Sequence, residues 1–276
     1  MKANSKQSIC AFIHYSQGNK IPYNVEVYIK ELVRFFDVVR LITNRRSIEN
    51  QHVLPSCVQV QFEKNEGYDF GLFNKFFNSI NRTKYHTIAC INDSNVLINK
   101  LDPVFQWGKN QTADFWGIID SNERPWFSTH KENYHLQSHF LIFRNTAIAK
   151  LENYFNWLDM DSILEIEDVK KLRRKIINDW EIGLSCYFKQ EGISINSYCK
   201  SSEFNHRHHK KTDVNTMHKL PKELVRANFP IVKKKILQKE LKHWLGGVRA
   251  RCWTNLVVQH GNNEWNLNEI LKEIKQ

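Results

Sequence analysis

An acidic residue stands at the end of an apolar segment that is typical of a buried strand. Residues 85–91 read Tyr-His-Thr-Ile-Ala-Cys-Ile, and Asn92, Asp93 and Ser94 follow them. A carboxylate beside a hydrophobic sheet is costly unless a cation meets it. Because ligands of open α/β sheets bind at the carboxyl ends of the strands, Asp93 is a candidate to contact a metal ion or a nucleotide sugar. A strand-ending turn residue is the alternative interpretation.

Strand and helix patterns alternate along the first part of the chain. Apolar residues recur at helical spacing in 24–36 and 70–80. The predicted strands are 9–14, 37–42, 58–62 and 85–91. This alternation predicts an α/β, Rossmann-type fold with a doubly wound, mostly parallel central sheet. Neither G-x-G-x-x-G nor a P-loop follows any of these strands, so a nucleotide would need another mode of binding.

The second half of the chain gives fewer strand signals. Segment 135–143 alternates polar and apolar residues before it becomes wholly apolar, which predicts one strand that enters the core from a cleft. From Thr146 onward we expect a mainly helical chain. Residues 201–213 are polar enough to predict a long loop.

The chain is strongly basic, and the basic residues are concentrated late in the sequence. The formal net charge is +11, and cationic residues gather in 206–211 and 233–251. Phe229, Trp244 and Trp253 are interleaved with them. Such a mixture suits an acidic membrane surface, with cations against phospholipid and aromatic rings at headgroup depth. A solvated helix face is an equally good interpretation.

Several classes of protein are disfavoured. No apolar run approaches the roughly 20 residues that span a bilayer, and residues 1–8 lack the apolar core of a signal peptide, so we expect a cytoplasmic protein. The six cysteines lack C-x-x-C spacing and are expected as buried thiols. The charge would also suit nucleic acid, but no DNA- or RNA-binding motif accompanies it.

Six short motifs carry a family resemblance. In chain order they are 64–71 (Lys-Asn-Glu-Gly-Tyr-Asp-Phe-Gly), 92–94, 114–117 (Asp-Phe-Trp-Gly), 135–138 (His-Leu-Gln-Ser), 180–185 (Trp-Glu-Ile-Gly-Leu-Ser) and 228–233 (Asn-Phe-Pro-Ile-Val-Lys). In this order the chain resembles the rhamnan synthesis protein F family of bacterial polysaccharide glycosyltransferases. The resemblance implies a GT-A-like fold that transfers a sugar, rhamnose or another hexose, from a nucleoside diphosphate to a capsule or O-antigen glycan.

The resemblance also implies an organisation and partners. Residues 1–200 would form the catalytic core, and residues 201–276 would form a basic, mainly helical extension packed on it. The implied donor is a UDP- or dTDP-sugar, and the implied acceptor is a glycan or lipid-linked glycan. Contact with the cytoplasmic face of the inner membrane would fit such an acceptor, and no nucleic acid is implied.

A divalent metal is a further implication. A GT-A enzyme often neutralises its leaving diphosphate with a cation held at the end of the fourth strand, which implies Asp93 as a catalytic residue and ligand, helped by Asn92 and Ser94. Oxygen ligands suit Mg²⁺ or Mn²⁺. His218 resembles a late histidine ligand of such enzymes, although a surface or capping histidine is the alternative. The motif here is Asn-Asp-Ser instead of the usual Asp-x-Asp.

Inverting transfer also needs a general base to take the proton of the acceptor hydroxyl. The resemblance implies Glu181 for this role, at the expected start of an amphipathic helix. Asp179 is the fallback. An ordinary carboxylate in the first turn of a helix is the alternative.

Residues that follow the first three strands are expected to bind the donor. They are His14, Tyr15, Gly18, Asn44, Lys64, Asn65, Gly67, Tyr68 and Asp69. Gly67 would let the backbone approach the ligand, and Asp69 would accept hydrogen bonds from sugar hydroxyls. The residues expected beside the sugar or the acceptor are Trp116, His135 and Gln137. Lys233 would meet the diphosphate or a lipid-linked acceptor.

Two departures from the family pattern leave a second hypothesis open. Lys64 stands where the family typically has arginine, so a bidentate phosphate contact is replaced by a point charge. Residues 95–98 read Asn-Val-Leu-Ile where Gly-Pro often follows the acidic motif. The second hypothesis is a catalytically inactive glycan-binding or scaffold subunit. A glycosidase is disfavoured because no second carboxylate is evident to pair with Glu181.

Overall fold

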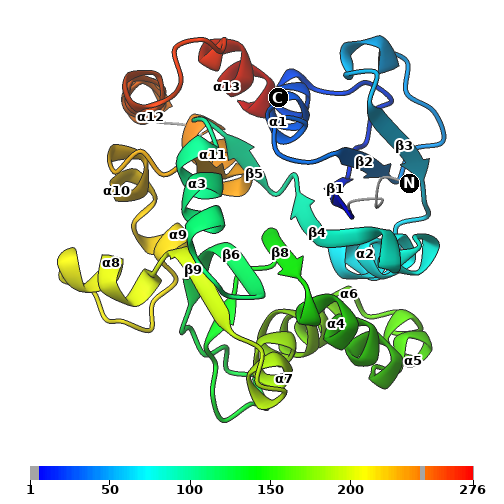
Figure 1. Ribbon diagram of the computed structural model, residues 1–276. Helices are drawn as coiled ribbons and strands as arrows, with labels where there is room; N and C mark the ends of the chain where they lie inside the picture. Colours follow the sequence, from blue (N-terminus) through cyan, green and yellow to red (C-terminus); the bar gives the residue numbers. More distant parts are fainter. Residues whose placement is uncertain (1–5, 243–245, 276) are drawn as a thin grey trace.

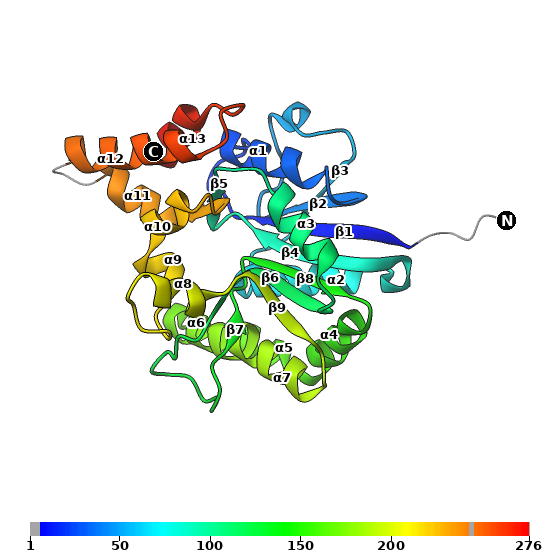
Figure 2. The same cartoon turned by 60° about the vertical axis from the view of Figure 1, so that its left-hand side comes forward.

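The computed structural model describes residues 6–242 and 246–275. Its centre is an eight-stranded sheet with helices on both faces (Figures 1 and 2). The strand order is β3-β2-β1-β4-β8-β6-β7, with β9 on β6. The strands are β1 Gln7–His14, β2 Val38–Thr43, β3 Val58–Phe62, β4 Tyr85–Asn92, β6 Phe115–Ser121, β7 His135–Leu136, β8 Phe140–Arg144 and β9 Ile195–Cys199.

The direction of the strands brings several carboxyl ends to one edge. Strands β3, β2, β1 and β4 run parallel, β8 runs antiparallel between β4 and β6, and β9 is parallel to β6. Ile13 lies opposite both Ile42 and Asn92, so β1, β2 and β4 end at the same level. The predicted α/β class with a mostly parallel central sheet is confirmed.

Apolar residues of the strands alternate between the two faces, and each face is covered by its own helices. Cys10 and Phe12 pack with α1 and α3, whereas Ala11 and Ile13 pack with α2, α4 and α7. The helices are α1 Tyr23–Leu32, α2 Tyr68–Ser79, α3 Asp102–Asn110, α4 Thr146–Trp157, α5 Met160–Leu164, α6 Val169–Ile176, α7 Leu184–Gln190, α8 Ser201–Arg207, α9 Thr216–Lys219, α10 Pro221–Arg226, α11 Lys234–Lys242, α12 Gly246–His260 and α13 Leu267–Lys275. Short 3₁₀ turns occupy Gln51–Val53 and Arg82–Lys84, and a π-helical segment, Ile177–Gly183, joins α6 to α7.

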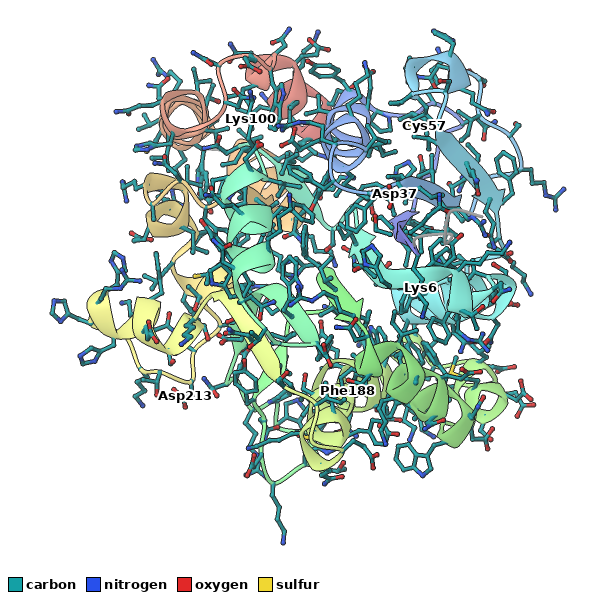
Figure 3. The ribbon with its side chains drawn as sticks, in the orientation of Figure 1. Lys6, Asp37, Cys57, Lys100, Phe188 and Asp213 are labelled. Carbon is teal, nitrogen blue, oxygen red and sulfur yellow. The ribbon has the colours of Figure 1, made fainter. Side chains whose placement is uncertain are left out.

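The last quarter of the chain returns to the beginning of the fold. Strand β10 (Ile231–Lys233) pairs antiparallel with β5 (Asn95–Leu97) in a separate two-stranded sheet. Helix α13 packs against α1 (Figures 1 and 2), where the Glu273 carboxylate accepts hydrogen bonds from the backbone N–H of Tyr23 at 3.0 Å and of Asn24 at 3.2 Å. Lys100, labelled in Figure 3, forms an ion pair with Glu264 at 2.8 Å. The division at residue 200 stays a prediction.

Two predictions of local structure are wrong. Residues 201–213 begin with helix α8, because Phe204 packs in the core and the Asn205 amide donates to the Val214 carbonyl at 2.8 Å. Helix α8 therefore has a buried face, with Phe204 and Asn205, although its sequence is mostly polar. Segment 135–143 forms two short strands, β7 and β8, because residues 137–139 between them leave the ladder and line a cavity.

The prediction that the cysteines are buried thiols is correct for only some of them. Cys10 and Cys90 are buried free thiols, and burial raises the pKa of both, but Cys57 and Cys252 are exposed. Within the described residues, no helix is both long and apolar enough to cross a membrane.

Two of the three aromatic residues proposed for a membrane surface are not on the protein surface. Phe229 and Trp253 are buried in the protein, so neither can lie among lipid headgroups, while Trp244 lies outside the described residues. The basic side chains of 206–211 are exposed. A membrane contact would therefore rest on charge in this region.

Candidate functional site

A cavity of about 650 Å³ lies at the edge of the sheet where β4 ends and β8 begins. Its walls come from the start of α2, from α6 and the π-helical segment, from α9 and from β10. Nine residues that the sequence predicted for the site line it: Tyr68, Asp69, Asn92, Ser94, His135, Gln137, Glu181, His218 and Lys233. We call it the sheet-edge cavity.

Glu181 lies in the π-helical segment on the wall of this cavity. The backbone N–H of Ser138 donates to its Oε1 at 3.3 Å, and the Ser138 hydroxyl donates to the same oxygen. The prediction that Glu181 begins a helix is wrong, because α6, the π-helical segment and α7 follow one another without a break. Glu181 therefore has a fixed position but no helix N-terminus to stabilise its charge. π-helical turns within α-helices frequently occur at functional sites.

Asp69 faces the same cavity from the first turn of α2. Its Oδ2 accepts a hydrogen bond from the side-chain amide of Asn92 at 2.6 Å, and the Oδ1 atom of Asn92 in turn accepts from the Ser94 hydroxyl at 2.6 Å. Burial raises the pKa of Asp69 to about 7, and the charges of Asp93 and Glu181 act in the same direction, against Lys233. Near neutral pH this carboxyl group can both donate and accept hydrogen bonds.

The backbone before Asp69 is held in an uncommon conformation. Gly67 and Tyr68 both have positive φ angles, of 73° and 55°. The left-handed φ of Gly67 favours glycine, and a Cβ atom there would lie 2.6 Å from the Leu164 side chain. Its predicted approach to a ligand stays a prediction. The Tyr68 hydroxyl donates to the Val169 carbonyl at 3.3 Å, which ties the start of α2 to the start of α6.

Lys233 lines the same cavity, and its charge interacts with both carboxylates, Asp69 and Glu181. Burial lowers the pKa of Lys233, while the charges of Glu181 and Asp69 oppose this shift. Burial also lowers the pKa of His139 and His218, and the charge of Lys233 adds to the effect on each. Both imidazoles are therefore held neutral at pH 7. The His139 Nε2 atom has no hydrogen-bond partner among the described residues, which leaves it available to a ligand.

Asp93 points away from this cavity. Its Oδ2 lies 2.9 Å from Nδ1 of the buried His14 and 3.4 Å from Nζ of Lys234. Burial acts to raise the pKa of Asp93, but the hydrogen bond from His14 and the charges of His14 and Lys234 outweigh it, so the pKa lies below its ordinary value. Adjacent side chains therefore have different surroundings. Asn92 and Ser94 line the cavity, whereas Asp93 is paired with His14 and Lys234 outside it.

The predicted metal site can be compared with these contacts. His218 lines the sheet-edge cavity, but Asp93 does not. Across residues 6–242 and 246–275, no group of three or more His, Cys, Asp or Glu side chains is arranged to hold a metal ion. A carboxylate bound to a lysine and a histidine does not fit a metal centre shared by Asp93 and His218.

The family can be assigned from the sequence. A sequence model described as rhamnan synthesis protein F matches residues 39–267. The chain belongs to this family. All of the cavity residues of this rhamnan synthesis protein F family member lie within the matched range. Membership supports glycosyl transfer related to nucleotide sugars as its general function.

Solved structures with a similar arrangement share little sequence with this family member. One, assigned as a glucose-1-phosphate thymidylyltransferase from Bacillus anthracis in complex with sucrose, has a TM-score of 0.41 and 10% identity over 75% of this chain and 97% of its own. Another, a 4-diphosphocytidyl-2C-methyl-D-erythritol synthase from Anaerococcus prevotii DSM 20548, has a TM-score of 0.39 and 11% identity over 63% and 84%. Among curated proteins, no sequence matches the chain significantly.

The remaining predicted donor residues lie outside the sheet-edge cavity. Tyr15 and Gly18 lie in an exposed loop after β1, where the Asn44 side chain bonds both backbone groups of Ser16. Asn65 is exposed, and Lys64 is exposed and paired with Glu66 at 2.6 Å.

Trp116 is also apart from the cavity. It is buried in the core, 5.6 Å from the Trp107 ring centre and 6.1 Å from that of Phe105. Its position is explained by packing against α3.

Several cavity residues were not predicted. They are Ser138, His139, Lys170, Arg173, Asn215 and Lys235. Ser138 and His139 lie in segment 135–143, whose alternating polar and apolar residues predict a strand that borders a cleft. In the structure they occupy the break between β7 and β8. Nothing in the local pattern distinguishes Arg173 from the other basic residues of α6.

Proposed function

We propose that this protein is a GT-A-type glycosyltransferase. It transfers a sugar from a UDP- or dTDP-sugar to a glycan or lipid-linked glycan of a surface polysaccharide at the cytoplasmic face of the inner membrane. The observation that carries the proposal is the sheet-edge cavity, where Glu181 is fixed by Ser138 and faces Lys233 and Asp69 at the carboxyl end of β4.

The cations of the cavity support binding of a diphosphate. Lys233, Lys235, Lys170 and Arg173 line it from β10, α11 and α6. Their side chains can donate charge-assisted hydrogen bonds to phosphate oxygens, which are stronger than neutral ones. Asp69 and Asn92 lie beside them and suit the hydroxyl groups of the transferred sugar. The nucleoside would extend toward the loop of Tyr15 and Asn44, across the ends of β1 and β2.

Glu181 acts as the general base in this proposal. The acceptor hydroxyl gives its proton to the Glu181 carboxylate as its oxygen attacks the anomeric carbon. The bond from this carbon to the phosphate oxygen breaks, and the nucleoside diphosphate leaves with the electron pair. Lysine and arginine side chains stabilise the charge that develops on it. Attack from the side opposite the leaving group inverts the configuration.

Donor binding and transfer can be tested separately. Thermal shift with UDP-, dTDP-, GDP- and CMP-sugars identifies the donor, because a ligand that binds the native state raises its melting midpoint. Glu181→Gln should keep this shift and lose about 10²–10⁴ in kcat. Glu26→Gln is the matched control, because Glu26 lies on α1 outside the sheet-edge cavity and is paired with Lys30 at 2.6 Å. An unchanged kcat in Glu181→Gln would contradict the proposed base.

A scaffold subunit that binds glycan without transferring sugar is the second candidate. The pairing of Asp93 with His14 and Lys234 favours it, because the acidic residue of the motif faces away from the cavity. The scaffold predicts binding of oligosaccharides with no melting shift from any nucleotide sugar. A shift with one nucleotide class excludes it.

A further inference from the structure

A second cavity of about 990 Å³ lies on the other side of the helical wall that carries Glu181. It is bounded by α4, α5, α6, the π-helical segment, α7 and the loop of residues 122–134. The four helices lie together in the lower part of Figure 1. Neither the proposed donor nor the proposed base uses this cavity.

Three aromatic rings form a row in this second cavity. The ring of Tyr154 lies 5.7 Å from that of Trp157 and 4.9 Å from that of Tyr187. Trp157 is 73% exposed although its ring is large and apolar, while Tyr154 is buried and its hydroxyl donates to the Asp179 carbonyl. Flat rings of this kind stack on the C–H face of a sugar ring, and the buried tyrosine holds the row in place.

The polar groups of the second cavity suit an uncharged ligand with many hydroxyl groups. Its acidic and basic side chains are equal in number: Asp159, Asp179 and Glu191 against Lys171, Arg174 and Lys175. Lys175 and Asp179 neutralise each other at 2.8 Å. The amide of Asn178 and the hydroxyl of Thr129, 3.0 Å apart, add donors and acceptors beside the rings.

One helical segment contributes residues to both cavities. Ile177, Trp180 and Glu181 line the sheet-edge cavity, while Asn178 and Asp179, in the same π-helical segment, line the second. Phe127 lines both. A chain of sugars whose end is at Glu181 would therefore meet the aromatic row as it leaves the cavity beside Phe127.

We propose that the second cavity, with Trp157 and Tyr187 as its stacking surface and the buried Tyr154 as their support, binds the acceptor polysaccharide chain behind its reacting end. This assignment rests on the proposed function, because it takes the sheet-edge cavity as the place of transfer. It gives the protein an acceptor site that prefers long chains to short ones.

Calorimetric binding of a rhamnose disaccharide and a rhamnose octasaccharide tests the assignment without any donor. The octasaccharide should bind more tightly than the disaccharide. Trp157→Ala should raise the octasaccharide Kd roughly three- to tenfold, which is the loss of one ring contact, and should leave the disaccharide Kd unchanged. Trp157→Phe, which keeps a ring, should restore most of the affinity. Phe62→Ala is the control, because Phe62 is an exposed aromatic residue on β3.

The outcomes separate this assignment from the proposed function. Equal octasaccharide affinity of Trp157→Ala and the parent protein overturns the second cavity as the acceptor site, even if nucleotide sugars bind. Equal affinity of the parent for the two oligosaccharides also overturns it. If no nucleotide sugar binds while the length preference and its loss in Trp157→Ala persist, the glycan site stands and the transfer function falls.

Discussion

Two aspartates at the same edge of the sheet, Asp69 and Asp93, have opposite surroundings. Asp69 meets an amide of Asn92 and an open cavity, and its pKa is raised to about 7. Asp93 meets His14 and Lys234 behind the sheet edge, and its pKa is lowered although burial opposes this. The partner, more than the depth of burial, decides the charge of each carboxyl group.

This difference separates structural from ligand-facing roles. A carboxylate that is satisfied by cations stabilises the fold, whereas one whose charge is not neutralised is ready to interact with a ligand. Carboxylates with different pKa values commonly divide the tasks of an active site. We therefore expect substitutions of Asp93 to affect stability and substitutions around Asp69 to affect binding.

The largest effect is expected from removing the paired carboxylate. Asp93→Ala leaves Lys234 and His14 without their acidic partner, and breaking such a buried pair should lower the free energy of unfolding by about 3 kcal/mol. Urea denaturation at pH 7 measures this. Asp102→Ala is the control, since its pair with Arg34 is about half exposed and should contribute less than about 1 kcal/mol. Equal losses in the two variants would show that Asp93 is not a structural carboxylate.

The dependence of stability on pH should differ in sign for the two aspartates. The pKa of Asp69 is raised in the folded state, so the folded protein binds its proton more tightly between about pH 4 and pH 7. Stability should therefore fall as pH rises through this window, by at most about 1.4 kcal/mol per pH unit, and Asp69→Asn should remove this slope.

Asp93 should act at lower pH. Its folded pKa is lowered, so its contribution is present above about pH 4 and is lost as pH falls through the folded value. Asp93→Asn should flatten the acid side of the stability curve and leave the slope between pH 4 and pH 7 in place. Denaturation midpoints from pH 3 to pH 8 measure both variants, and a single variant that removed both slopes would contradict the separation.

Two neighbouring lysines give a sharper binding test. Lys233 lines the sheet-edge cavity, whereas Lys234 pairs with Asp93. Lys233→Ala should weaken binding of free UDP or dTDP by about tenfold through the loss of a charge-assisted contact. Lys234→Ala should lower stability and leave the Kd within about twofold, a factor worth only about 0.4 kcal/mol. Calorimetric titration of both variants measures the two Kd values. A weaker Kd in Lys234→Ala with an unchanged Kd in Lys233→Ala would assign the phosphate contact to Lys234.

The smallest effect is expected from divalent cations. Because the Asp93 carboxylate is already paired with Lys234, replacing Mn²⁺ or Mg²⁺ by a chelator should change the Kd of the nucleotide sugar by less than about twofold. The melting shift with and without EDTA measures this. Loss of the shift in EDTA would support the sequence-based prediction of a metal, and Asp93→Asn would then locate it.

Sequence reasoning predicted the sheet well because its signals are local. The strands of 9–14 and 85–91 are short apolar runs, and their carboxyl ends meet for simple topological reasons. It also predicted Glu181 and Lys233 for the site, through motifs far apart in the chain. It did not give the direction of side chains: Asp93 faces away from the cavity, and its partner Lys234 lies 141 positions later in the sequence.

The unpredicted parts depend on long-range packing. Trp116 has a side chain that would suit a sugar, but it packs with Trp107 and Phe105 once α3 covers its strand. The ring contact of Tyr154 and Tyr187 forms only where α4 meets α7. No periodicity in the sequence specifies such contacts.

The hydrogen bonds from Tyr23 and Asn24 to Glu273 have a consequence for biosynthesis. They join residues 250 and 249 positions apart, so the start of α1 is completed by a residue that is translated about 250 positions later. Contacts of such long range slow folding, because a large loop must close before they form. On the ribosome, α1 of a nascent chain would wait until Glu273 has been synthesised, and its apolar face would meanwhile need protection from aggregation.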